Sequence, residues 1–143
     1  LGANNIFGGF RNTLSTFSEW VKPAGQILIL EEFWKQYPAP EYLTLLGIDP
    51  DTFEMVSHYD NVIMGESQGL ILSYSMVCNQ DEWDHYEGLF WRGIEKYAIK
   101  NPESQDVPEL LTRIRRWKQG YFRWGRDTLA CGIYLFYKPG NFE

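Results

Sequence analysis

The sequence contains few of the residues that mark metal-binding, disulfide-bonded or membrane proteins. It has two cysteines, Cys78 and Cys131, and two histidines, His58 and His85, and none falls in a CxxC, HxxxH or HExxH pattern. No metal site is predicted, and both cysteines are expected to be free thiols. No apolar run approaches the roughly 18 residues that a membrane-spanning helix needs, and the first residues do not form a basic and apolar leader. We therefore expect a cytoplasmic protein without a membrane partner.

Positive charge is also scarce. The chain has 13 Lys and Arg against 19 Asp and Glu, a formal net charge of −6, which argues against nucleic acid as a partner. One segment departs from this balance, because residues 113–126 place six basic residues among four aromatic ones. Such a segment could line a groove for single-stranded nucleic acid. Its helical spacing also fits a solvated basic face beside an aromatic core stripe, which is the plainer interpretation.

The residues that are abundant indicate a folded α/β chain. At 143 residues, with 44% apolar and 17% aromatic content, the chain is long enough for one domain with its own core. Phe10, Leu14 and Phe17 recur at helical spacing and predict a helix over about residues 8–22. Lys22 and Pro23 end it, and Gly25 is expected to supply the free backbone angle of a turn. An unbroken apolar run then predicts a buried strand over 26–32.

Further elements alternate along the rest of the chain. A short helix is expected near 40–46, and Asp51 with Glu54 predicts a capped helix start leading to about residue 68. A strand over 70–77 should place Leu72, Tyr74 and Met76 on one face. Helices over about 80–101 and 106–126, capped at Asn79 and Asp106, predict a hairpin, and an apolar strand follows at 129–137.

The junction between the first helix and strand carries a resemblance. Val21-Lys22-Pro23-Ala24-Gly25, followed by the strand from Gln26, resembles the Leu-Lys-Pro-Gly-Gly junction of class I S-adenosylmethionine-dependent methyltransferases, with Ala24 in place of the first glycine. Residues 80–87 together with 123–127 also resemble a subgroup of uncharacterised bacterial members. The resemblance implies an α/β fold that is the C-terminal half of a Rossmann-like methyltransferase sheet. Its last strand would be antiparallel, and residues of about 80–126 would form a helical hairpin insertion.

The same resemblance implies that part of the family's cofactor site lies elsewhere. The family binds S-adenosylmethionine through a glycine-rich loop and an acidic residue that precede this junction, and Gly8-Gly9 does not form a GxGxG pattern. Leu1-Gly2-Ala3 resembles the end of the family's fourth strand. We therefore expect residues 1–143 to be a single partial domain that is inactive and binds the cofactor weakly by itself. The partner it needs would be a missing N-terminal half or a second chain.

Candidate site residues follow from the end of the first strand. In open α/β sheets, ligands bind beyond the carboxyl ends of the parallel strands, which favours Asn4 and Asn5 near the methyl donor and Glu31 and Glu32 near the acceptor. Methyl transfer needs an in-line geometry and sometimes a base, a role that Glu31 or Glu32 could take. A loop cap or a solvent-facing position is the simpler interpretation of either glutamate.

Aromatic residues are the second group of candidates. Phe33, Trp34, Trp83 and Tyr86 could form a wall for a small-molecule methyl acceptor. Trp83 and Tyr86 also lie on a helical stripe, and core packing is the plainer interpretation of both. The sequence leaves open whether the chain acts as an enzyme or as a non-catalytic binding or assembly module. In the module, a partner chain, or a second copy in a homo-oligomer, would cover the half-sheet, and exposed strand edges favour such association.

Overall fold

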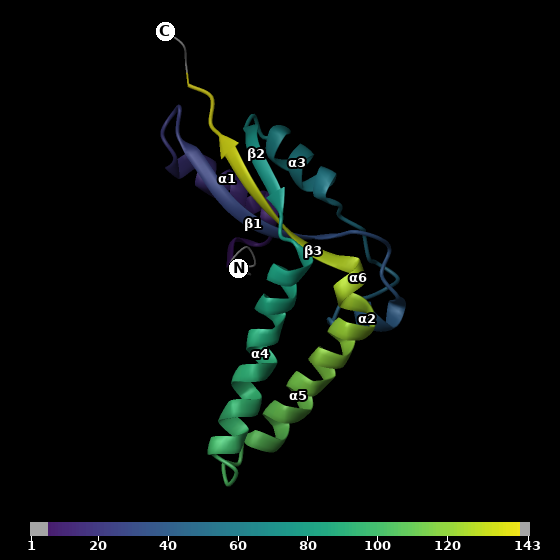
Figure 1. Cartoon of the computed structure of the whole chain (residues 1–143). Helices are drawn as coiled ribbons and strands as arrows, with labels where there is room; N and C mark the ends of the chain where they lie inside the picture. The colour runs from purple at the N-terminus through teal and green to yellow at the C-terminus, as the bar shows by residue number, and fades with distance from the viewer. Residues whose placement is uncertain (1–5, 141–143) are drawn as a thin grey trace. The chain divides into compact units, whose positions relative to one another are not determined.

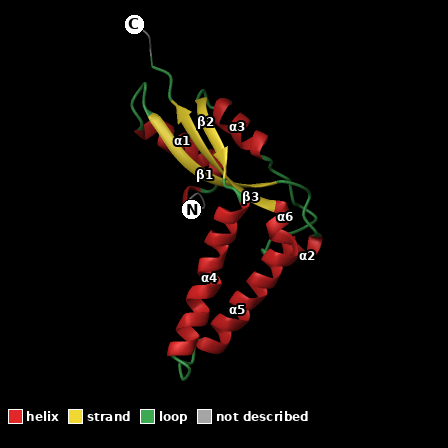
Figure 2. Cartoon of the chain, in the orientation of Figure 1, coloured by secondary structure: helices red, strands yellow, loops and turns green. Residues whose placement is uncertain are grey.

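The computed structural model describes residues 6–140 and shows the elements of an α/β protein (Figures 1 and 2). Their order and bounds are α1 (Phe10–Trp20), β1 (Gln26–Trp34), α2 (Pro40–Leu45), α3 (His58–Glu66), β2 (Ile71–Val77), α4 (Gln80–Lys100), α5 (Val107–Gly120), a π-helical turn η2 (Tyr121–Gly125), α6 (Arg126–Thr128) and β3 (Leu129–Tyr137). The chain forms two compact units. The sheet unit comprises residues up to 35, 55–78 and 130 onward, and the helical unit comprises 36–54 and 79–129.

Among the described residues, the sheet unit contains three strands in the order β1-β3-β2, so β3 lies between the other two (Figure 1). β3 pairs with β2 in antiparallel register. Reciprocal bonds join the beginning of β1 to the end of β3, from Ala24 N to Lys138 O at 3.0 Å and from Lys138 N to Gly25 O at 2.9 Å. This is an antiparallel pattern. The prediction of an antiparallel final strand is confirmed.

A bulge in β2 overturns the predicted faces of that strand. The register shifts between Leu72 and Tyr74, so Leu72 pairs with Phe136 whereas Tyr74 and Met76 pair with Leu135 and Ile133. An extra residue reverses the alternation of side chains, because their period along a strand is two. Leu72 therefore lies on the opposite face from Tyr74 and Met76.

One face of the sheet carries the core. Its buried side chains come from α1, from β1 and β3, and from the residue before β2, and they are Phe10, Leu14, Ile27, Ile29, Leu70, Tyr134 and Phe136. Val62 and Met64 of α3 pack against the same cluster. Gly65 of α3 meets the Phe136 ring so closely that a β-carbon there would overlap it. Thus α1 and α3 both cover this face of the sheet.

The other face of the sheet keeps apolar side chains exposed. Leu28 of β1 is 64% exposed, Tyr74 of β2 is 60% exposed, and Ile71 and Met76 of β2 are exposed as well. Ile71, Tyr74 and Met76 share this face with their pairing partners Tyr137, Leu135 and Ile133. We call this surface the open sheet face. Large contiguous apolar surfaces of this kind mark places where another polypeptide packs.

The turn before β1 uses its residues differently from the prediction. Gly25 N donates to Lys22 O at 2.9 Å, which closes a four-residue turn with Pro23 second and Ala24 third. The left-handed residue is Ala24, with φ of 63°, and Gly25 does not have positive φ. Gly25 is needed for a different reason, because a β-carbon there would lie 2.8 Å from Lys22 O. The expectation that Gly25 supplies the left-handed angle is wrong.

The start of α3 is also displaced from its predicted position. Asp51 and Glu54 do not begin a helix, and α3 starts at His58 after the N-cap Ser57. Ser57 Oγ accepts from Asp60 N at 3.2 Å, and the Asp60 carboxylate accepts from Ser57 N at 2.7 Å. Two capping patterns compete within the ten residues 51–60, and the complete reciprocal box is the one that forms. Residues 54–56 are left outside the helix, where Val56 O accepts from Trp34 N at 2.9 Å.

The helical unit is built on the predicted hairpin of α4 and α5, which run side by side in Figure 1. The cap of α4 forms as predicted, because Asn79 Oδ1 accepts from Glu82 N at 2.9 Å while Asn79 N donates to Glu82 Oε2 at 2.8 Å. Asp106 precedes α5 without a side-chain cap bond, since its backbone is already helical. The predicted continuous helix over 106–126 is corrected as well, because η2 separates α5 from α6. Among the described residues, no helix combines the length and apolarity needed to cross a membrane.

Candidate functional site

The two predicted carboxylates lie on β1 in the sheet unit. Glu31 is half-buried and Glu32 is exposed. Because side chains alternate along a strand, Glu31 shares the face of Ile27 and Ile29, and Glu32 shares that of Leu28. Crowding by surrounding protein atoms raises the pKa of Glu32 above its ordinary value. The Glu32 side chain is nevertheless exposed, so a proton can reach it from outside the protein.

Phe33 and Trp34 complete β1, and both side chains are buried. The Phe33 ring lies 5.0 Å from the imidazole of His58, measured between ring centroids. The backbone of Trp34 is held by its bond to Val56 O. The Phe33 ring therefore packs against His58 within the sheet unit.

A buried polar chain that the sequence did not reveal adjoins this strand. Asn61 of α3 and Tyr134 of β3 are 1% and 0% exposed. Asn61 Nδ2 donates to Glu32 O at 3.2 Å and lies 3.1 Å from Tyr134 Oη, which in turn lies 2.8 Å from His58 Nδ1. Burial is the main cause that raises the pKa of Tyr134 to about 12. In the sequence, Asn61 is an Asn in a helix and Tyr134 is a Tyr in an apolar strand. Nothing in the sequence predicts that these two residues, more than 70 positions apart, form a hydrogen bond.

Cys78 and Cys131 are neighbours in the sheet unit. Cys78 N donates to Cys131 O at 3.0 Å, as expected if their strands pair. Both are free cysteines, which agrees with the prediction. Burial first, and the nearby Cys78 second, raise the pKa of Cys131 to about 12. The Cys131 thiol is therefore protonated at neutral pH and is a poor nucleophile.

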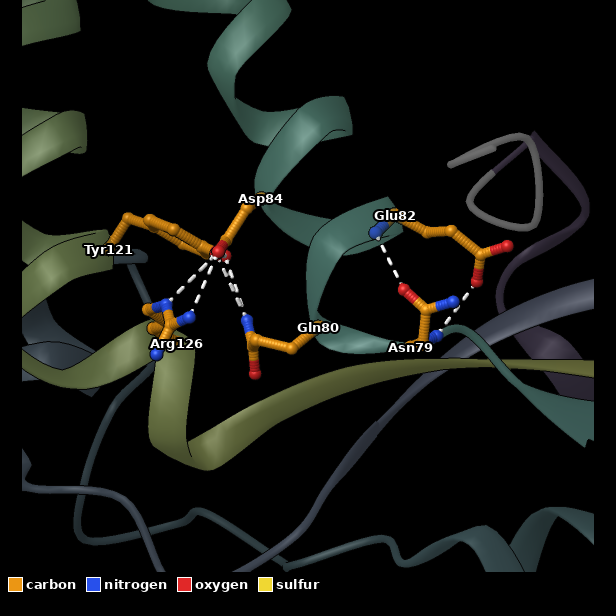
Figure 3. A network of polar contacts seen from close by, with 6 residues as sticks. All are labelled: Asn79, Gln80, Glu82, Asp84, Tyr121 and Arg126. Carbon is orange, nitrogen blue, oxygen red and sulfur yellow. Dashed lines mark hydrogen bonds and ion pairs between the residues drawn. The ribbon is translucent and has the colours of Figure 1, made fainter.

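The helical unit contains a second polar centre around Asp84 of α4 (Figure 3). Its carboxylate accepts from Gln80 Nε2 at 3.0 Å, from the Tyr121 hydroxyl, and from Arg126 Nε and Nη2 at 3.1 Å and 3.0 Å. The bonds from Arg126 and then Tyr121 lower the pKa of Asp84 to about 2. The network joins the first turns of α4 to η2 and α6. Four donors on one carboxylate occupy its acceptor sites, so Asp84 is committed to holding these elements.

Trp83 and Tyr86 lie beside this network on α4. Their rings are stacked with centroids 5.4 Å apart, and Trp83 is 4% exposed. Trp83 Nε1 is buried and has no hydrogen-bond partner among the described residues. The indole of Trp117 differs, because its Nε1 donates to the buried Glu87 carboxylate at 2.7 Å. Since buried indole donors are normally paired, Trp83 is the exception that calls for an explanation.

The remaining predicted sites can be placed only in part. Asn4 and Asn5 lie outside the described residues. Within residues 6–140, no three His, Cys, Asp or Glu side chains gather as metal ligands would. In the basic segment, Arg115 pairs with Glu95 at 2.9 Å and Arg126 with Asp84 at 3.0 Å. These two cations are thus engaged by acidic side chains of α4.

Comparison of the sequence with known proteins gives a distant relative. No family model matches the sequence. The chain is 24% identical over 134 residues to the uncharacterised protein YjhP of Escherichia coli K12. The match covers 94% of this chain and 54% of YjhP. The chain thus spans about half the length of the curated relative it matches.

Comparison of the structure identifies the fold. A SAM-dependent methyltransferase from Geobacter sulfurreducens in complex with S-adenosyl-L-homocysteine superposes with a TM-score of 0.83 and 22% identity, over 95% of this chain and 55% of that one. A methyltransferase from Thiobacillus denitrificans, in complex with the same molecule, gives 0.82 and 22% over 95% and 55%. The crystal structure of YjhP gives 0.83 and 23% over 95% and 56%. The fold is that of the C-terminal half of these methyltransferases, as the sequence predicted.

Proposed function

We propose that this chain is the acceptor-binding portion of an S-adenosylmethionine-dependent methyltransferase that acts on a small molecule. The observation that carries the proposal is the superposition of 95% of the chain on methyltransferases crystallised with S-adenosyl-L-homocysteine. The strand order β1-β3-β2 agrees with the antiparallel last strand that the resemblance implied. At this level of identity the likeness concerns the fold, so the reaction is inferred from the site.

The described residues do not form a complete cofactor site. They contain no GxGxG loop, and only Gly8 and Gly9 come near the glycine-rich pattern that cradles a nucleotide. S-adenosylmethionine, when bound, supplies the electrophilic methyl group. We infer that a polypeptide corresponding to the uncovered part of the solved structures holds most of the cofactor, and that Asn4 and Asn5 contact it from this chain.

The proposed role of the glutamates is to accept the proton of the nucleophile. Glu31 and Glu32 lie in consecutive positions near the carboxyl end of β1, the end at which α/β sheets bind ligands. Glu32 is exposed with a raised pKa, which suits a carboxylate that takes up a proton during reaction. We favour Glu32 as the base and Glu31 as a group that holds the acceptor.

The aromatic residues are proposed as acceptor contacts, and each pair is described within its own unit. Phe33 and Trp34 form a buried support at the end of β1. In the helical unit, Trp83 and Tyr86 stack on each other, and the unpaired Nε1 of Trp83 is a donor that a ligand oxygen could satisfy. A buried donor without a partner costs about 1–3 kcal/mol, so such a position is retained more easily where a ligand pairs with it.

The alternative function is a non-catalytic binding or assembly module. The open sheet face favours it, because Leu28 and Tyr74 are 64% and 60% exposed on an apolar surface. In that case a second copy of this chain would cover the face. Light scattering separates the two proposals, since the module predicts a stable homodimer of the isolated chain.

The experiment that tests the methyltransferase proposal measures cofactor binding. Calorimetry with S-adenosyl-L-homocysteine should detect no low-micromolar binding by the isolated chain. The chain mixed with the complementary part of the Geobacter sulfurreducens methyltransferase, which is the part it does not cover, should form a complex that binds. A homodimer that neither joins the complementary part nor binds the cofactor product would support the module.

A further inference from the structure

The buried chain of Asn61, Tyr134 and His58 is more than core packing requires. Asn61 and Tyr134 are buried at 1% and 0% exposure within an otherwise apolar cluster. Burying polar groups costs free energy unless every one of them is hydrogen-bonded. The hydrogen bonds of Asn61 and Tyr134 meet this requirement, and the series of bonds leads to His58, which is half-buried. All of its members lie in the sheet unit.

The donor and the acceptor of each hydrogen bond can be assigned, because the orientation of the Asn61 side-chain amide is determined by its partner. Glu32 O, a backbone carbonyl, can only accept, so the Asn61 atom 3.2 Å from it is the nitrogen. The same nitrogen lies 3.1 Å from Tyr134 Oη and gives it the second amide proton. Tyr134 Oη therefore accepts from Asn61, and its own proton is free to bond His58 Nδ1 at 2.8 Å.

The opposite direction would leave a buried proton without an acceptor. If His58 Nδ1 carried a proton and donated to Tyr134 Oη, the hydroxyl proton would need another acceptor, and the described residues offer none. An unpaired buried donor costs about 1–3 kcal/mol, which strongly favours donation from Tyr134 to Nδ1. With Nδ1 occupied as an acceptor, a neutral His58 carries its proton on Nε2.

The imidazole ring is also fixed in orientation. It is stacked on the Tyr134 ring with centroids 5.0 Å apart and packs against Phe33 at 5.0 Å. Its Nε2 has no hydrogen-bond partner among residues 6–140, and the side chain reaches solvent. Desolvation lowers the pKa of His58, which agrees with a neutral ring near neutral pH. The result is one N–H donor held in a fixed orientation by the rings of Tyr134 and Phe33.

We propose that His58 is an acceptor-binding residue, whose Nε2–H donates a hydrogen bond to a carboxylate or carbonyl oxygen of the methyl acceptor. The proposal rests on the proposed function and adds a substrate class, a small molecule that carries an oxygen acceptor. His58 does not act as a base in this arrangement, because the lone pair of Nδ1 is already bound by Tyr134. Proton removal is thereby left to a carboxylate, and Asn61 and Tyr134 are positioning residues.

The tautomer of His58 gives a direct test in the intact chain. Two histidines are present, so long-range ¹H–¹⁵N spectra contain two imidazoles, and His85→Gln assigns them. At pH 7 we expect His58 to show an unprotonated Nδ1 and a protonated Nε2. Tyr134→Phe should bring the two nitrogen shifts toward each other, whereas Tyr121→Phe, whose hydroxyl bonds Asp84, should leave them unchanged. A protonated Nδ1 in the wild-type chain, or an unaltered spectrum in a folded Tyr134→Phe variant, would overturn the assignment.

Sodium acetate is the probe for the ligand class. At constant ionic strength maintained with chloride, acetate should produce a saturable shift of the His58 Nε2 resonance. In Tyr134→Phe the amplitude should fall, because Nδ1 is no longer held as an acceptor and part of the population then carries the proton on Nδ1. Absence of a saturable shift, or an equal shift at His85, would reject the proposed donor. The chain mixed with the complementary part could bind acetate and still fail to bind S-adenosyl-L-homocysteine. In that case the role of His58 as a hydrogen-bond donor would stand, and the methyltransferase proposal would be rejected.

Discussion

At the scale of single residues, Ala24 shows how one position can depart from the rest of a motif. The turn Lys22-Pro23-Ala24-Gly25 requires positive φ at its third residue, and Ala24 adopts φ of 63°. An L-residue in this conformation is disfavoured by about 1–2 kcal/mol because its β-carbon approaches the following carbonyl oxygen. The chain tolerates this strain in the turn that joins α1 to β1.

Replacing Ala24 with glycine should therefore stabilise the protein. Relief of the left-handed strain outweighs the extra entropy of glycine in the unfolded chain, which is about 0.4–1 kcal/mol. We expect Ala24→Gly to raise the free energy of unfolding by about 0.5–1 kcal/mol, measured by urea denaturation. Ala98→Gly in α4 is the matched control and should lower stability by about 1 kcal/mol, because Ala98 is helical. Equal destabilisation by both changes would show that Ala24 is not strained.

Some contacts between single residues could not be predicted from the sequence. Glu31 and Glu32 could be proposed because they follow an apolar strand, a signal contained within a few adjacent residues. The partnership of Asn61, Tyr134 and His58 joins residues 73 and 76 positions apart and has no such spacing. It depends on the pairing of β3 and the packing of α3, so only the tertiary structure reveals it.

At the scale of secondary structure, the predicted elements were correct where the local sequence contained one clear pattern. The capping box at Asn79, the hairpin of α4 and α5, and the three strands were all predicted and are confirmed. Errors arose where a signal was duplicated or interrupted. The box at Ser57 took precedence over Asp51, the bulge after Leu72 reversed a strand face, and the π-helical turn interrupted the stripe after Gly120. Neither a bulge nor a π turn has a sequence pattern as strong as a cap.

The Asp84 network makes a prediction about how the helical unit responds to acid. The folded pKa of Asp84, about 2, lies below its ordinary 3.8, so its carboxylate stabilises the folded chain above about pH 4. That contribution is lost as the pH falls from about 4 toward 2. Asp84→Asn should lower the free energy of unfolding by about 0.5–1 kcal/mol at pH 7, because the pair with Arg126 is partly exposed.

Urea denaturation at several pH values checks this expectation. The difference between the wild-type chain and Asp84→Asn should shrink as the pH falls from 4 to 2. The exposed Asp127→Asn makes the same chemical change outside the network and should show a smaller difference at pH 7. A difference for Asp84→Asn that is constant from pH 7 to pH 2 would contradict the assigned role of the carboxylate.

At the scale of the whole molecule, the open sheet face is the largest feature that the local sequence patterns left unexplained. α1 and α3 cover one face of the sheet, and Leu28 and Tyr74 remain exposed on the other. The fold of the C-terminal half was predictable because the helix-turn-strand junction and the order of elements are local or sequential features. The apolar run over 26–32 predicted a strand buried on both faces, and this is wrong for the open face, because Leu28 of β1 is 64% exposed there.

A charged side chain on the open face should interfere with that packing. We expect Leu28→Lys to leave the free energy of unfolding of the isolated chain within about 0.5 kcal/mol, because Leu28 is exposed. The same variant should bind the complementary methyltransferase part at least tenfold more weakly, measured by calorimetry. Tyr59→Lys on the outer side of α3 is the matched control, and it should bind normally because Tyr59 is exposed elsewhere on the sheet unit. Equal binding by Leu28→Lys would exclude the open face as the docking surface.

The most direct test of the central proposal is S-adenosyl-L-homocysteine binding with and without the complementary part. Calorimetry should show no low-micromolar binding by the isolated chain and clear, saturable binding by the folded complex with the complementary part. The complementary part alone should bind more weakly than the complex. Low-micromolar binding by the isolated chain, or a folded complex that does not bind, would contradict the account.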